Sequence, residues 1–134
     1  MIYKAKTDKT PENVLREEIL KERAEVLGRA GEKLSAAINR MDAIEKGIQE
    51  RWKQFKRERE TCRKKNKTQD VLFLRRQMVK DINGEIRKYN SAREHAKLRY
   101  YYLIVTREAM GMRRHHWVDE MYRIPPKKKY LREG

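Results

Sequence analysis

Apolar residues recur at every seventh position of this sequence from Leu20 to Cys62. Seven residues nearly complete two turns of an α-helix, so these side chains lie along one side of a single long helix. A helix of that length is not stable alone in water and needs a partner along most of its face. The ladder predicts a long packed helix with these seam residues: Leu20, Leu27, Leu34, Met41, Ile48, Phe55 and Cys62.

A second ladder predicts the partner helix. Thr10 and Pro11 are typical of a helix start, and the polar segment Lys64–Thr68 is typical of a turn. We therefore predict an N-terminal arm at 1–10, a helix at 11–65, a turn at 66–68 and a helix at 69–111 that ends at Gly111, with Asn66 or Thr68 capping the second helix. Asn83-Gly84 is a strong turn signal, but the apolar spacing continues through it and favours one continuous helix. The second ladder comprises Ile82, Tyr89, Ala96, Leu103 and Met110.

The short turn makes the two helices antiparallel neighbours, so residue i of the first faces roughly residue 133 minus i of the second. The predicted fold is all-α: a long antiparallel, coiled-coil-like helical hairpin at 11–112 plus a short helix and a basic, mobile tail at 113–134. Ladders this dense also predict self-association into a homo-oligomer that completes a bundle.

Composition narrows the function classes. The 134 residues suit one domain, and 41% of them are charged, which fits long solvated helices better than an enzyme with a deep pocket. We expect no enzymatic activity and no cofactor. The single cysteine excludes an internal disulfide. Without an apolar run long enough for a signal peptide or a membrane span, we expect an intracellular protein with no membrane partner.

Positive charge is concentrated in the second part of the chain. Residues 1–50 hold ten Lys/Arg and ten Asp/Glu, whereas residues 51–134 hold twenty-five and ten and carry the whole net charge of +15. The stretch 97–114 faces Glu17, Glu18, Glu22 and Glu25 in the register, so we expect internal neutralisation there. The hairpin tip has no such acidic partner.

The sequence therefore predicts that the tip binds nucleic acid or another polyanion non-specifically, in an architectural or nucleoprotein role. DNA, RNA and an acidic protein partner all remain open, because no base-reading motif is present. The alternative is a coiled-coil adaptor or scaffold that docks on another protein. The predicted phosphate contacts are Lys53, Lys56, Arg57, Arg63, Lys64, Lys65, Lys67, Arg75 and Arg76 in the tip and Lys127, Lys128 and Lys129 in the tail.

A second apolar stripe on the second helix faces away from the ladder and predicts another interface. Its partner is either the short C-terminal helix, folded back with Trp117, Val118, Met121 and Ile124 on one side, or a second subunit. The predicted interface residues are Leu98, Tyr101, Val105, Met112, Trp117 and Met121.

Three other patterns favour structural roles over chemistry. His115 and His116 precede Asp119 and Glu120 by four residues, a spacing that can hold a metal, but one helical turn offers too few ligands for a closed site. We expect no metal site and expect these groups to pair or cap instead. Cys62 lies on the apolar ladder, as a small core residue does. An α-helix has 3.6 residues per turn, so the three consecutive tyrosines at 100–102 spread over about 200° of its circumference. They cannot all face one side, so packing accounts for them better than base stacking does.

Overall fold

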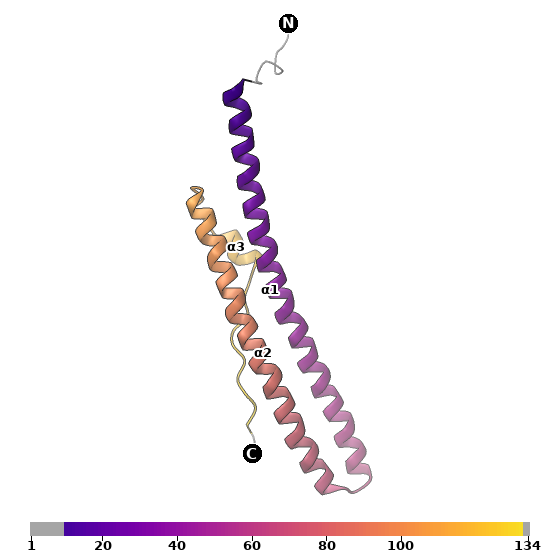
Figure 1. Ribbon diagram of the computed structural model, residues 1–134. Helices are drawn as coiled ribbons and strands as arrows, with labels where there is room; N and C mark the ends of the chain where they lie inside the picture. The colour runs from indigo at the N-terminus through magenta and orange to yellow at the C-terminus, as the bar shows by residue number, and fades with distance from the viewer. Residues whose placement is uncertain (1–9, 133–134) are drawn as a thin grey trace.

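The computed structural model describes residues 10–132, so the predicted arm at 1–10 lies almost wholly outside the described residues. Three helices follow one another: α1 (Pro11–Lys64), α2 (Thr68–Ala109) and α3 (His116–Met121). The two long helices run antiparallel and pack against each other, and α3 lies beside them (Figure 1). The predicted all-α hairpin with a short third helix is confirmed.

Local signals set the ends of α1. The Thr10 side chain accepts a hydrogen bond from the Asn13 amide at 3.2 Å, and Pro11 occupies the first turn, as predicted. At the other end Asn66 adopts a left-handed conformation (φ 58°), and the Lys67 amide donates back to the Cys62 carbonyl at 3.0 Å. This is the Schellman pattern. The prediction that Asn66 or Thr68 caps α2 is wrong, because Asn66 ends α1 and Thr68 is already the first residue of α2.

The second helix is continuous through Asn83 and Gly84, as the apolar spacing predicted. It ends two residues earlier than predicted, at Ala109. Gly111 (φ 87°) then reverses the chain, and the Met112 amide donates to the Arg107 carbonyl at 2.9 Å. This repeats the ending of α1 with glycine at the left-handed position, where a Cβ would add strain.

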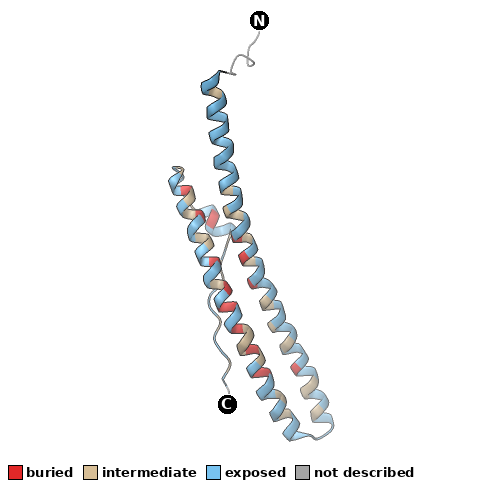
Figure 2. Ribbon diagram, in the orientation of Figure 1, coloured by how far each residue is buried: buried red, intermediate tan, exposed pale blue. Residues whose placement is uncertain are grey.

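Three apolar clusters between the long helices form the core (Figure 2). Their buried members lie close to the predicted register, in which paired residue numbers add to about 133. Arg51 and Asp81, joined by an ion pair at 3.2 Å, follow the same rule. Nearest the tip, the first cluster combines Phe55, Met78, Val79, Ile82 and Ile86; the second combines Ala37, Met41, Tyr89, Ala92 and Ala96; the third combines Leu34, Leu103 and Val118.

The first turns of α1 extend past the end of α2, as Figure 1 shows. By the register, Ala109 at the end of α2 lies opposite residue 24, so the residues before it have no partner helix. Residues 11–26 contain no buried side chain, and Leu20 is 59% exposed. The expectation that the ladder packs from its first residue is therefore wrong: packing begins at half-buried Leu27. We call residues 11–26 the overhang.

The segment after α2 folds back onto the hairpin. Val118 of α3 is fully buried against Leu34 and Leu103, and Ile124 and Leu131 pack against the two clusters nearer the tip. The predicted mobile tail is wrong, because residues 122–132 run in an extended path along the two long helices (Figure 1). We call residues 122–132 the strap.

Two asparagines of α2 hold the strap by its backbone. The Asn90 side chain accepts from the Lys128 amide at 2.9 Å and donates to the Lys128 carbonyl at 3.1 Å. Asn83 makes the same pair of bonds with Leu131, at 2.7 and 3.0 Å. The Arg93 guanidinium adds a 2.7 Å bond to the Pro125 carbonyl. Because these bonds satisfy the polar backbone of an extended segment, the strap can lie on an apolar seam at little desolvation cost.

Tyr89 is buried under the strap, and we expect it to make the stability of the fold sensitive to alkaline pH. Burial raises the pKa of the Tyr89 phenol above its ordinary 10.0, and nearby Lys128 partly opposes that shift. The phenol therefore ionises in the unfolded chain first, so the free energy of unfolding falls as pH rises past about 10. Urea unfolding between about pH 8 and 11 should show a shallower fall for Tyr89→Phe than for the wild type. Equal slopes for the two proteins would contradict this account.

Candidate functional site: a basic hairpin tip

The tip of the hairpin, residues 51–80, combines the end of α1, the turn and the first turns of α2. It holds twelve Lys/Arg and three Asp/Glu. All nine cations that the sequence placed there are exposed. Within the described part of the chain, Lys53 is the one among the nine with a carboxylate in ion-pair range, that of Glu50 at 3.9 Å. A pair at that distance on an exposed helix contributes little, so the positive charge remains largely uncompensated.

Apolar side chains accompany these cations. Leu72 and Phe73 of α2 are 52% and 66% exposed, and Trp52 of α1 carries the Lys56 ammonium 5.3 Å from its ring centre. A surface groove of about 420 Å³ between the helices is lined by apolar, polar and charged side chains: Arg57, Glu58, Thr61, half-buried Cys62, Asp70, Phe73 and Leu74. Cations interleaved with exposed aromatic rings are the combination that single-stranded nucleic acids meet in proteins that bind them without sequence preference.

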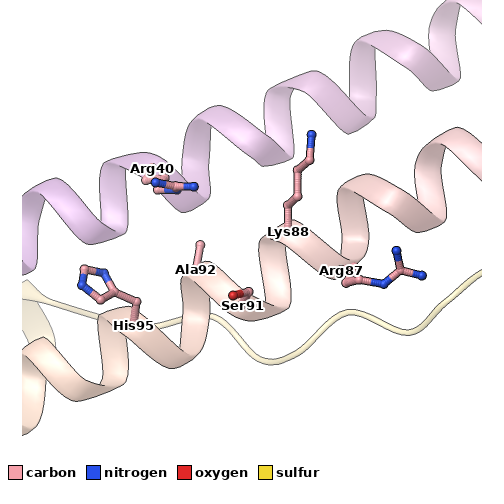
Figure 3. A pocket seen from close by; sticks show the side chains of 6 residues that line it. All are labelled: Arg40, Arg87, Lys88, Ser91, Ala92 and His95. Atoms are coloured by element: carbon pink, nitrogen blue, oxygen red, sulfur yellow. The ribbon is translucent and has the colours of Figure 1, made fainter.

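A second basic cluster lies in a groove of about 540 Å³ farther along the hairpin. Figure 3 shows Arg40 on α1 across from Lys88 and His95 on α2. Among residues 10–132, no carboxylate lines this groove. Lys88 also pairs with Glu85 at 3.1 Å. Sequence reasoning missed this cluster because its members come from two helices, although the register places Arg40 opposite residue 93. The described residues that line it are Arg40, Arg87, Lys88, Ser91, Ala92 and His95.

The three tail lysines are in unlike environments. Lys127 and Lys129 are exposed, but Lys128 forms an ion pair with Glu45 and lies 4.9 Å from the centre of the Tyr89 ring. Its ammonium is therefore engaged in holding the strap. Two of the three predicted tail cations are therefore exposed, and the third is not.

The neutralisation predicted for the other basic stretch, residues 97–114, is not observed. Among the described residues, no ion pair joins it to the acidic residues of the overhang, and Lys97 pairs instead with Glu94 at 3.8 Å. The reason is geometric: α2 ends opposite residue 24, so Glu17, Glu18 and Glu22 lie beyond it.

The second apolar stripe of α2 is exposed, with Leu98, Tyr101 and Val105 between 44% and 56% accessible. The prediction that α3 covers this stripe is wrong, because α3 directs Val118 into the seam and leaves Trp117 and Met121 exposed. Met112 is exposed as well. The prediction that a second subunit covers the stripe stays a prediction.

Buried Arg107 organises the turn before α3. Its guanidinium donates to His115 Nδ1 at 3.2 Å and to the Arg114 carbonyl at 2.9 Å, and it lies 4.9 Å from the centre of the Trp117 ring. His115 therefore pairs with an arginine and not with the carboxylates expected from sequence. Between residues 10 and 132, no three His, Cys, Asp or Glu side chains are grouped closely enough to hold a metal ion.

No helix within residues 10–132 is both long enough and apolar enough to cross a bilayer. The tip itself presents exposed ammonium and guanidinium groups with neighbouring aromatic rings. Comparison of the chain with protein families, curated proteins and solved structures finds no match.

Proposed function

We propose that this protein binds nucleic acid or another polyanion non-specifically through its basic tip, as an architectural or nucleoprotein component. The observation that carries the proposal is the exposure of nine tip cations with almost no acidic partners. Like charges held this close repel one another, and a polyanion relieves that repulsion while it releases its own counterions. Lys127 and Lys129 add exposed cations on the strap.

Such contacts grip phosphates and carry no sequence information. Exposed Phe73 and Trp52 favour single strands over duplexes, because unpaired bases can stack on them. We therefore expect tight binding at low salt, steep loss of affinity as salt rises, and little dependence on base sequence.

The test is a salt series of binding to a generic single strand and a generic duplex. Changing Lys53, Arg57, Lys64 and Lys67 to Gln should weaken binding and reduce the slope of log K against log salt by about 1 for each lost phosphate contact. The matched control changes four exposed α1 cations outside the tip, Lys21, Arg29, Lys33 and Lys46, to Gln. This control variant removes the same amount of positive charge but should keep most of the slope of log K against log salt.

Two outcomes would contradict the proposal. Wild type that fails to bind either nucleic acid at about 50 mM salt, where phosphate contacts are strong, excludes it. Equal losses in the tip and control variants would show that net charge, and not the tip, is responsible.

A second candidate function is that of an adaptor that docks on another protein. The specific observation that favours it is the exposed stripe of Leu98, Tyr101 and Val105, which no other part of the described chain covers. An adaptor would bind bare nucleic acid weakly in the same salt series and would lose its partner on Tyr101→Ser.

A further inference from the structure

Both ends of the hairpin expose large apolar side chains, and their charges are opposite. The overhang holds five Glu and three Lys/Arg, whereas the tip holds twelve Lys/Arg against three Asp/Glu. The overhang has no partner helix in the monomer, and packing of an amphipathic face supplies most of a helix's stability, so a partner helix would stabilise it.

On the overhang, apolar and acidic residues form neighbouring rows. Leu15, Ile19 and Val26 fall within about 40° of one another on the helix, and each is exposed by more than a third of its surface. Beside them Glu18, Glu22 and Glu25 follow the i, i+4, i+7 spacing that aligns residues on one face. The overhang thus presents an apolar strip edged by carboxylates.

The outer face of α2 at the tip has the matching arrangement. Leu72 and Phe73 are exposed there, and Arg76 and Lys80 follow at i, i+4 spacing on the same side. Arg75 lies nearby and is also exposed. This face presents an apolar pair edged by cations, within the first four turns of α2.

The two surfaces also agree in length and direction. The sixteen residues of the overhang span about 24 Å at the rise of an α-helix, the length of the α2 segment from Thr68 to Asn83. A copy placed beyond the open end of the hairpin, with its tip toward the overhang, sets α1 of one copy antiparallel to α2 of the next. That is the packing already used in the seam.

We propose that the overhang of one copy docks on the α2 face of the tip of another, so that copies join head to tail. Pairing of two overhangs would instead bring their glutamate rows together, which like-charge repulsion disfavours. Because the two surfaces differ, the contact is heterologous and leaves a free overhang and a free tip at the ends. Arg75 and Arg76 belong to both proposed surfaces, but the inference does not rest on the proposed function, because its test contains no nucleic acid.

The experiment is sedimentation velocity of the full chain over a concentration series at low salt, without nucleic acid. The wild type should show a mean mass that rises from one chain toward two or more, and added salt should reverse the rise. E18K/E22K/E25K and R75E/R76E/K80E should each remain monomeric. An equimolar mixture should assemble again, because each reversed surface then meets its complement. The matched control E32K/E108K/E120K changes charge equally at exposed sites elsewhere and should assemble.

The E18K/E22K/E25K variant could fail to assemble because its overhang loses helix. L72S/F73S avoids that ambiguity, because it leaves the overhang unchanged and alters only exposed residues on the α2 face of the tip. It should abolish assembly and leave the circular dichroism at 222 nm unchanged. A wild type that stays monomeric throughout, a mixture that fails to assemble, or assembly of L72S/F73S overturns the proposal. Assembly of R75E/R76E/K80E alone would show that overhangs pair with each other.

Discussion

Leu34→Ala should lower the free energy of unfolding by about 3 kcal/mol. Leu34 has no exposed surface and joins α1, α2 and α3, because it packs with Leu103 and Val118. Truncation removes apolar contacts and leaves a cavity that three elements cannot easily close. The measurement is urea unfolding followed by circular dichroism, at a protein concentration low enough to keep the chain monomeric.

The matched control is Leu20→Ala, two steps earlier on the same ladder. Leu20 is 59% exposed because α2 ends before reaching it, so the same chemical change should alter the free energy by no more than about 0.5 kcal/mol. Similar losses at both positions would mean that the overhang is packed in the free monomer, contrary to the structure.

The second large effect is expected from Asn83→Ala combined with Asn90→Ala. The pair removes four hydrogen bonds to the strap, of 2.7 to 3.1 Å, each contributing about 1 kcal/mol. Alanine is the better helix former, so α2 itself should not weaken. The strap should therefore detach while the hairpin remains.

Hydrogen exchange of the Lys128 and Leu131 amides measures this directly, since both amides donate to the lost side chains. We expect protection in the wild type and in Asn39→Ala, a control at an exposed α1 position, and near-complete loss in the double variant. Retained protection would show that apolar anchors such as Ile124 suffice to hold the strap.

The hairpin could be predicted because its determinants are local and repetitive. The apolar residues at every seventh position lie on the same side of the helix, and the short turn fixes the register. Phe55 and Met78 could therefore be paired from the sequence alone. The strap could not be predicted, because asparagine side chains and backbone groups hold it and leave no periodic signal. The composition of KKKYLREG is typical of solvated chain ends. The available signal was two asparagines seven residues apart on α2, beside the seam.

The candidate site also has a part that could be predicted from sequence and a part that could not. Exposure of Lys64 or Arg76 follows from the high cost of burying charge, so sequence is enough to place such residues at the surface. Lys128 departs from that expectation because Glu45, from a distant part of the chain, supplies a partner. The Arg40–His95 groove needed both helices in place.

The strap also bears on the order in which the molecule assembles. Pairing of the long helices can proceed outward from the turn, because each new contact along the seam closes only a slightly longer loop than the one before. The strap has no such route: its partners Glu45 and Asn90 lie on different helices, so its binding surface exists only after they have paired. We therefore expect the strap to join the fold after the two long helices have paired, and the seam beneath it to stay exposed to water until then.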